Sequence, residues 1–454
     1  MRRLLLSLAT LLPILHATAQ DGLWSPVSKD NLKTFLNGRS AVSQLPTNYE
    51  LVKLNRSQLQ LLQKQAPLVK PGTRSTLSPV RISLPLPIAD QSISSAFTES
   101  PVLSDALAKQ LTGFKTYELK DPVTRGLQGR LSVTAQGVTG LIFTEKGTAY
   151  IYPVSPDYPD VHMVHYVKDI PFTLPVACGT KEVAAARSNN SGSRIQTAVG
   201  DCQLRNYRLA VAATGEYTAW AGGTQAQALT YIGITVNDVT AIYQRDAAIT
   251  FTLVSNSSTV YTDATTDPYS AGSGAGATLT ENHNTMNAVY TPGGYDLGIV
   301  FHNGWNGGVA ALQSTCYDPW KGMAAAGLSF GTGANPTMGP QGPIFVNTVA
   351  HEMAHQFGVQ HTMSSTGGGC NGNVNSSTAW ETGGGSTIMA YAGVCTGNAY
   401  QTYSDLYFHG GSILQMMNYA INSATCGTIS ALSNTAPTVS VSSSSYTIPV
   451  STPF

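Results

Sequence analysis

Charge is scarce in this sequence. Asp, Glu, Lys and Arg make up 11% of its 454 residues, less than half of the roughly 25% that an ordinary soluble domain carries. Acidic and basic residues balance at 25 each, so no basic surface for nucleic acid is expected and that class of function is excluded. The 42% hydrophobic content still supports sizeable cores, and the length suits two or three domains.

Long hydrophobic runs are absent after the N-terminus. The first residues, MRRLLLSLATLLPILHATAQ, contain two arginines, an apolar run and an A-x-A cleavage site, which predicts a secretory signal peptide over residues 1–19 that is cut before Gln20. A membrane anchor would need a longer uninterrupted apolar span, and Pro13 and His16 interrupt this one. The protein is therefore expected to be secreted, without a membrane span. Its six cysteines are then expected to be mostly in disulfides.

The first half of the chain has the pattern of a β-rich domain. Between about residues 80 and 180, short β-branched and aromatic runs alternate with turn signals at Gln136-Gly137 and Lys146-Gly147. Residues 183–200 contain little apolar content beyond alanine. We interpret this stretch as an exposed linker between two domains.

The second half, residues 201–430, has the pattern of a mixed α/β domain. Its predicted elements are a strand at 206–217, a helix at 222–244, and strands at 247–255 and 295–302. A strand–helix–strand order that ends in a motif-bearing helix predicts an α/β sandwich. Residues 431–454 contain no charge and are predicted to be a linker entering a further, truncated β-domain.

The stretch VNTVAHEMAHQFGVQHT, residues 346–362, carries the candidate chemistry. On a helix, apolar residues four apart form one stripe toward a core: Phe345, Val349, Met353 and Phe357. His351 and His355 are also four apart, but on the other side, so their imidazoles point the same way. Two neutral imidazoles one turn apart suit a zinc ion. Glu352 lies beside them, where a carboxylate could take a proton from water.

Gly358 extends this pattern. A glycine three residues after the second histidine can adopt a positive φ and end the helix, so the chain can turn back and bring His361 to the same metal. The complete pattern H-E-x-x-H-x-x-G-x-x-H is rare by accident. The alternative, a helix with surface histidines, is the weaker interpretation.

With Met389 in ETGGGSTIMAYAGVC, the motif resembles the metzincin zinc proteases, which continue with a methionine turn below the metal. Over about residues 80 to 430 the chain is similar to the bacterial, secreted reprolysin-like (adamalysin-related) metallopeptidases. The similarity extends to NYRLAVAATGEY, YQRDAAITFTLVSN, YDLGIVFH and YFHGGSI. It implies an α/β (α+β) metzincin catalytic domain with a mixed twisted sheet and an active-site helix, preceded by a β-rich propeptide at residues 20–182.

The resemblance also assigns roles to the motif residues. His351, His355 and His361 would hold one zinc ion per chain, and Glu352 would be the general base. Met389 would pack beneath the metal without binding it.

Other residues near the motifs receive weaker assignments. Tyr391 has two open interpretations: it stabilises the developing oxyanion, as tyrosines at this offset suggest in the astacin and serralysin branches, or it is a packed core residue. Residues 305–313 match the edge strand with which metzincins pair extended substrate. Calcium is not predicted, because Leu209 stands where the venom reprolysins need a glutamate. Five further polar residues are not expected to bind the metal: Glu381, Asp405, His283, His302 and His409.

Four cysteines are assigned to two disulfides. Cys370 and Cys395 bracket the loop from the third histidine through the methionine turn. Cys316 and Cys426 lie at positions that resemble the reprolysin link between the body and the C-terminal end of the domain.

For Cys178 two hypotheses stay open. It could form a third disulfide with Cys202 across the linker. Alternatively, in LPVACGTKE, it could be the propeptide thiolate that binds zinc and keeps the enzyme latent, as in reprolysin-type proteases. Activation would then need a cut in the linker, near Arg187 or Arg194.

The sequence therefore predicts a secreted zinc endopeptidase made as a zymogen, with protein or peptide substrates and its own propeptide as inhibitor. Two alternatives come from other classes of function. One is a non-catalytic adhesin or binding module on a zincin scaffold, although none of the expected zinc-site residues is missing. The other is a zinc amidase that acts on cell-wall peptide.

Overall fold

The computed structural model describes residues 22–36, 45–70, 73, 78–121, 127–171, 177–178, 200–270, 275–291, 293–328, 342–397 and 399–432. The predicted signal peptide, the linker up to residue 199 with its two arginines, and the tail from residue 433 lie outside these residues. In the part of the chain that is described, no helix is long and apolar enough to cross a membrane.

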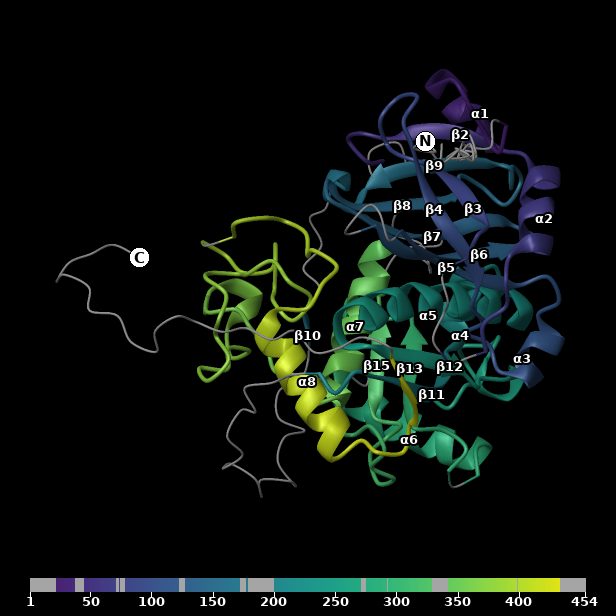
Figure 1. The fold of residues 1–454 in the computed structure, drawn as a ribbon. Helices are drawn as coiled ribbons and strands as arrows, with labels where there is room; N and C mark the ends of the chain where they lie inside the picture. Colours follow the sequence, from purple (N-terminus) through teal and green to yellow (C-terminus); the bar gives the residue numbers. More distant parts are fainter. Residues whose placement is uncertain are drawn as a thin grey trace, which may run out of the picture.

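A nine-stranded antiparallel sheet forms the N-terminal half, in the order β1-β2-β9-β8-β7-β6-β5-β4-β3 (Figure 1). Its strands are β1 (Trp24–Pro26), β2 (Glu50–Leu54), β3 (Arg81–Pro85), β4 (Ser92–Glu99), β5 (Lys115–Lys120), β6 (Gln128–Thr134), β7 (Gly137–Thr144), β8 (Gly147–Pro153) and β9 (Val161–Tyr166). The short helices of this half are η1 (Lys29–Asn31), α1 (Leu32–Phe35), α2 (Arg56–Gln65), α3 (Asp105–Gln110) and η3 (Val167–Asp169). Gly137 and Gly147 have positive φ, 125° and 123°, so both predicted turns form the hairpins around β7.

A second, mixed sheet forms the C-terminal half, in the order β10-β14-β15-β13-β11-β12, with β16 also paired to β11. Its strands are β10 (Ala177–Cys178), β11 (Gln203–Ala213), β12 (Ile249–Leu253), β13 (Leu297–His302), β14 (Gly307–Ala310), β15 (Ala324–Gly327) and β16 (Thr428–Ala431). The α-helices are α4 (Gly215–Trp220), α5 (Gln225–Ala247), α6 (Ala275–Val289), α7 (Pro343–Gln356) and α8 (Gly410–Asn422), with 3-10 turns η4 (Ser257–Thr259) and η5 (Gly368–Cys370). The predicted fold class, a mixed α/β domain after a β-rich domain, is confirmed.

Helix caps move two of the predicted boundaries. The strand expected to reach residue 217 ends at Ala213, because the Thr214 side chain accepts a hydrogen bond from the N–H of Tyr217 and starts α4. The helix expected from residue 222 starts at Gln225, because Thr224 caps it in the same way.

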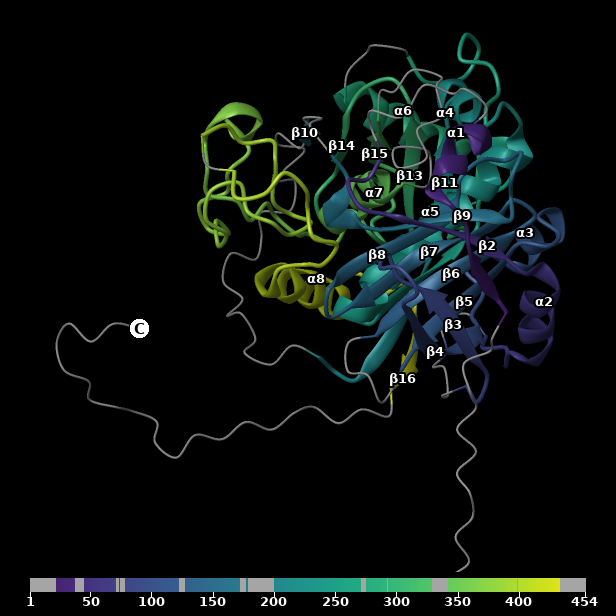
Figure 2. The same ribbon diagram turned by 90° about the horizontal axis from the view of Figure 1, so that it is seen from above.

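Helix α5 lies between the two sheets, as Figures 1 and 2 show. One hydrophobic core contains residues of both halves, among them Leu141 and Tyr150 of the N-terminal sheet and Val236 and Ile242 of α5. The buried Arg130 of β6 crosses this interface, donating from Nε to Asn237 Oδ1 (2.7 Å) and from Nη1 to Gln244 Oε1 (2.9 Å). The two halves therefore pack as one body.

Candidate metal centre

The site is built on α7, which begins with Pro343 at a position where a backbone N–H would have no partner in the helix. The predicted apolar stripe is completely buried, since Phe345, Val349, Met353 and Phe357 are each 0% exposed. Burial of this stripe fixes the rotation of the helix about its axis. His351 and His355 consequently point together away from the core.

The chain reverses at Gly358, as the sequence predicted. Gly358 has a φ of 82°, its N–H donates to the carbonyl of His355 (2.8 Å), and the N–H of Val359 donates to that of Ala354 (3.0 Å). These bonds end the helix in the left-handed turn that glycine adopts without strain. The reversal brings His361 beside the first two histidines.

The three imidazoles converge on one point. The Nε2 atom of His355 lies 3.1 Å from that of His351 and 3.2 Å from that of His361, and the remaining pair is 3.2 Å apart. Each Nδ1 contacts a backbone carbonyl: that of Ile388 (2.7 Å) for His351, Val359 (2.7 Å) for His355 and Asn373 (2.8 Å) for His361. A proton on each Nδ1 leaves the three Nε2 lone pairs free to bind one ion.

Cys178 of β10 supplies a fourth candidate ligand. Its sulfur lies 3.5 Å from Nε2 of His355, and the four ligand atoms all lie within 4.8 Å of one another. Nitrogen and sulfur ligands at tetrahedral zinc distances of about 2.0–2.3 Å would lie roughly 3.3–3.7 Å apart. The three nitrogens and the contact between Cys178 and His355 are close to these spacings, so the four side chains can surround one metal ion.

Burial keeps the three histidines in the neutral form that binds metal. It lowers the pKa of His351 to about 3 and that of His361 to about 4, and the neighbouring His361 adds to the effect on His351. The pKa of His355 is lowered well below 6.5, by burial first and then by the other two histidines. All three imidazoles are thus neutral at pH 7, as metal ligation requires.

Glu352 lies beside this cluster and is 1% exposed. Its Oε2 accepts from the Cys178 thiol at 3.5 Å, and burial raises its pKa well above 4.5. Gly308 of β14 passes so close that a Cβ atom there would lie 2.2 Å from Glu352 Cγ. Only glycine fits at position 308 without moving the glutamate.

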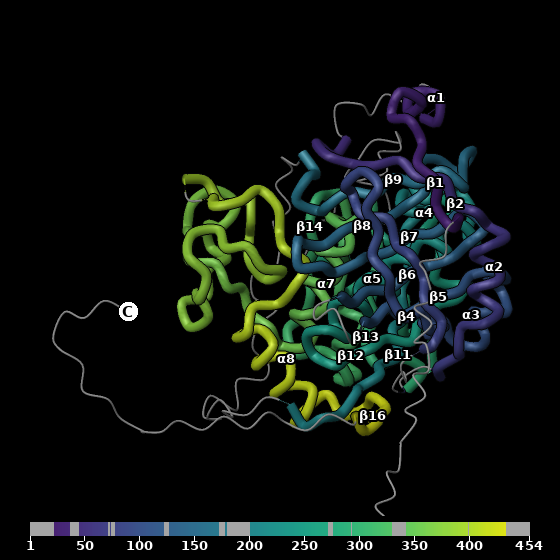
Figure 3. The backbone as a smooth tube through the Cα atoms, turned by 45° about the horizontal axis from the view of Figure 1, so that its top comes forward, coloured from purple at the N-terminus to yellow at the C-terminus, as the bar shows by residue number. Residues whose placement is uncertain are grey.

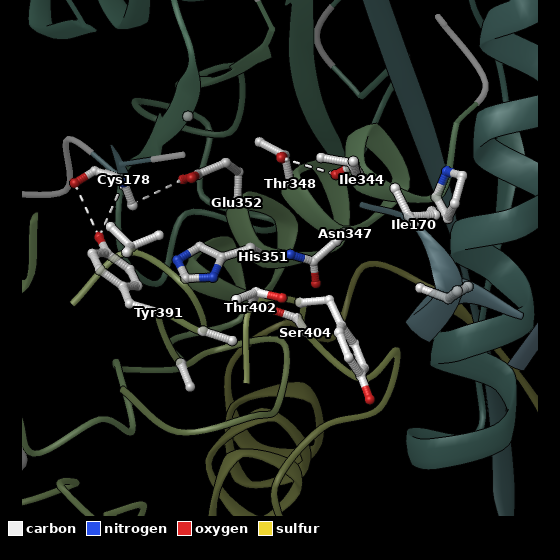
Figure 4. A pocket seen from close by; sticks show the side chains of 17 residues that line it. Ile170, Cys178, Ile344, Asn347, Thr348, His351, Glu352, Tyr391, Thr402 and Ser404 are labelled. Atoms are coloured by element: carbon white, nitrogen blue, oxygen red, sulfur yellow. Dashed lines mark hydrogen bonds between the residues drawn. The ribbon is translucent and has the colours of Figure 1, made fainter. Parts of the chain in front are cut away.

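Cys178 is held by its main chain as well as its sulfur (Figure 4). Its N–H donates to the hydroxyl of Tyr391, which in turn donates to the Cys178 carbonyl, both at 3.1 Å. Strand β10 pairs in parallel with β14, with Cys178 opposite Gly308. The outer side of the predicted substrate-binding edge is therefore covered by a segment of the N-terminal half.

The segment between α7 and α8 forms a lobe, which lies on the other side of α7 from the N-terminal sheet (Figure 3). Met389 is 0% exposed in its floor, and its carbonyl accepts from the N–H of Thr362 at 3.1 Å. Both expected disulfides are present, Cys370–Cys395 within this lobe and Cys316–Cys426 between the loop after β14 and the segment after α8. Cys178 and Cys202, both within the described chain, are not bridged to each other.

A pocket opens next to His351 and Glu352 (Figure 4). Helix α7 contributes Ile344, Asn347 and Thr348, and the lobe contributes Thr402, Tyr403 and Ser404. Val167 and Ile170 of the N-terminal half also line the pocket. That half thus reaches the candidate site at two places, here and at Cys178.

The residues set aside as ligands lie outside the cluster. Glu381 accepts hydrogen bonds from Thr362 and Thr387, His302 packs on Trp305 with ring centroids 4.1 Å apart, and His409 caps α8. Asp405 accepts from Gln401 at 3.2 Å, and His283 contacts Asn287 at 2.9 Å.

Comparison with known families gives the site a context. Residues 204–420 match the profile of the metallopeptidase family M12B, described as reprolysin-like. Residues 204–420 form a reprolysin-like metallopeptidase domain. The metallopeptidase match contains α7, His361 and Met389, so the resemblance inferred from the motifs is confirmed.

Two further comparisons are weaker. Among solved structures, the crystal structure of metalloproteinase-II from Bacteroides fragilis aligns with this metallopeptidase at 9% identity and a TM-score of 0.41, over 78% of this chain and 99% of that one. A score this low adds nothing to the assignment. No curated protein matches the chain.

Sequence reasoning missed two features of the metallopeptidase site. The glycine pair in WNGGVAALQ was a visible signal, but its reason, the contact of Gly308 with Glu352, needs the fold. The sequence presents Glu381 only as a possible ligand, and nothing in its spacing indicates that it joins two segments of the lobe.

Proposed function

We propose that this metallopeptidase is a secreted zinc endopeptidase made as an inactive precursor, with residues 20–182 as its propeptide. The observation that carries the proposal is the convergence of three buried, neutral imidazoles beside Glu352 at the edge strand β14. The signal-peptide pattern and the two disulfides support export.

In this proposal His351, His355 and His361 hold zinc. The bound ion would polarise a scissile carbonyl and lower the pKa of water. Glu352 would take the proton from water and pass it to the leaving amine. The outer edge of β14 would pair with an extended peptide, and the Tyr391 hydroxyl would donate to the substrate carbonyl oxygen as it gains charge.

The precursor would be latent because the same groups are occupied. The Cys178 sulfur lies at the metal position, and its strand β10 covers β14. The Cys178 carbonyl accepts a hydrogen bond from the Tyr391 hydroxyl. This arrangement favours the thiolate hypothesis for Cys178 over a disulfide with Cys202. A cut in the linker at residues 183–200 would begin activation.

Two substitutions separate metal binding from catalysis. We expect His355→Ala to lose most of its zinc, because one of three ligands is gone. Glu352→Ala should keep one zinc per chain, while casein cleavage falls by roughly 100- to 10,000-fold because the general base is missing. Elemental analysis and a casein assay on the activated protein check both. A Glu352→Ala protein that cuts at the wild-type rate would refute the mechanism.

The choice of substrate separates the other classes of function. The activated protein should cleave casein and leave purified peptidoglycan intact. Cleavage of peptidoglycan alone would indicate the amidase, and cleavage of neither would indicate a binding module.

A further inference from the structure

Glu381 is placed where two segments of the lobe meet. It lies on the chain between the third histidine and the methionine turn, and it forms an isolated β-bridge with Met363. Its N–H donates to the carbonyl of Thr362 at 2.8 Å. Glu381 is thus attached by its main chain to the residue that follows His361.

Its carboxylate accepts four hydrogen bonds. The hydroxyls of Thr362 and Thr387 both donate to Oε2 at 2.5 Å. The backbone N–H groups of Ser386 and Thr387 donate to Oε1 at 2.8 and 3.1 Å. These bonds saturate the carboxylate, so it serves as a link within the protein and not as a ligand.

Both ends of this link lead to a metal histidine. Thr362 directly follows His361 in the chain. Thr387 directly precedes Ile388, whose carbonyl contacts Nδ1 of His351 at 2.7 Å. A shift of either threonine would therefore move a ligand or the group that orients a ligand.

We infer that Glu381 is a positioning residue of the metal site, which ties the His361 segment to the carbonyl that orients His351. The inference rests on the proposed zinc function. Groups that orient metal ligands through hydrogen bonds commonly contribute about 10- to 100-fold to metal affinity. The carboxylate provides this orientation at two of the three histidines.

The test is zinc affinity of the full chain, measured by competition with a chromophoric chelator after zinc has been removed. We expect Glu381→Ala to bind zinc roughly 10- to 100-fold more weakly. The metal-free variant should be less stable than wild type, because four donors lose their acceptor, but it should stay folded at the temperature of the assay. Glu381→Gln keeps one acceptor oxygen and should fall in between. Asp405→Ala is the matched control, because that side chain accepts from Gln401 and Tyr407 instead; its affinity should not change.

A folded Glu381→Ala protein with wild-type zinc affinity would overturn the inference. So would a variant whose metal-free form is unfolded in the assay to an extent that accounts for its weaker binding. If Glu381→Ala does not fold, Thr387→Val decides, because it removes one hydrogen bond at nearly constant volume. It should lower zinc affinity roughly fivefold, and an unchanged affinity would again overturn the inference. Failure of the wild-type chain to bind zinc would refute the proposed function itself.

A visible spectrum gives an independent reading. With Co²⁺ in place of zinc, Glu381→Ala should shift or weaken the absorption bands that report tetrahedral geometry, and Asp405→Ala should keep them. Identical spectra for the wild-type protein, Glu381→Ala and Asp405→Ala would contradict a positioning role for Glu381.

Discussion

Gly308 sets how closely the edge strand can approach the candidate base. Its replacement by alanine would place Cβ 2.2 Å from Glu352 Cγ, so the carboxylate or the strand must shift. Misplacement of a reacting group by about 1 Å can cost roughly 100-fold in rate. We expect Gly308→Ala to retain zinc and to lose about 10- to 100-fold in casein turnover.

Gly304→Ala is the control for this substitution. It lies in the turn between β13 and β14, and its added Cβ would meet nothing closer than His302 Nδ1 at 3.9 Å. Equal activity of the two variants would show that the close approach to Glu352 has no catalytic consequence.

A second prediction at the scale of single residues concerns the thiol of Cys178. Cys178→Ala removes the sulfur beside His355 and Glu352. If the proposed function holds, the full-length variant should be active before processing and should be cut in the linker early. Casein cleavage by freshly purified precursor checks this. A latent variant, together with a 178–202 peptide from unreduced wild-type protein, would instead establish the disulfide.

Some contacts of single residues could be predicted from the sequence, and others could not. The pattern H-E-x-x-H-x-x-G-x-x-H predicted that His351, His355 and His361 would converge, because helix periodicity and the conformation of Gly358 are local properties. The contacts of Gly308 and Glu381 join segments far apart in the chain. Such contacts depend on the packing of the whole domain and leave no local signal.

Among the elements, β9 carries two histidines that must stay neutral. His162 accepts from the N–H of Val138 through Nε2 (2.9 Å) and contacts the Asp160 carbonyl through Nδ1 (3.0 Å). Burial lowers the pKa of His162, and also that of His165, to about 4. The unfolded chain takes up these protons below about pH 6.5, whereas the folded chain does so only near pH 4. Stability of the N-terminal sheet is therefore lost as pH falls between these values.

We expect the change from pH 7 to pH 5 to cost about 2 kcal/mol for His162 alone. Hydrogen-exchange protection of the Val138 amide measures it. His162→Gln can still accept from Val138 without titrating, so its protection should fall less over the same pH range. Equal losses in the two proteins would show that His162 is not responsible.

The elements themselves were predicted to differing degrees. The alternation of apolar residues and the Gln136-Gly137 and Lys146-Gly147 turns indicated the N-terminal strands, and the apolar stripe indicated α7. The start of α4 was missed, because the Thr214 cap follows a long apolar run that reads as one strand. The pairing of β10 with β14 joins segments about 130 residues apart and has no counterpart in any sequence period.

At the scale of the whole molecule, the linker is not what holds the halves together. They share a core, and backbone bonds join Ser104 to Leu253 (2.9 Å) and Leu253 to Val102 (2.7 Å). We therefore expect that a cut within residues 183–200 leaves both fragments associated at neutral pH. Gel filtration of the nicked precursor should show a single peak that contains both fragments.

A substitution of Arg130 can test the interface between the two halves, because this residue is buried in it. Arg130→Ala leaves Asn237 and Gln244 without their buried donor, which should make the nicked fragments separate more readily. Spontaneous separation of the nicked wild-type fragments would refute the prediction that the interface suffices.

The meander of the N-terminal sheet has a consequence for how the protein is made. From β3 to β9 each strand pairs with the next one in the chain, so most of these contacts form between near neighbours, and such topologies fold quickly. This half also leaves the ribosome first. We therefore expect the N-terminal sheet to form before α5, so that it serves as a template on which the rest of the chain folds.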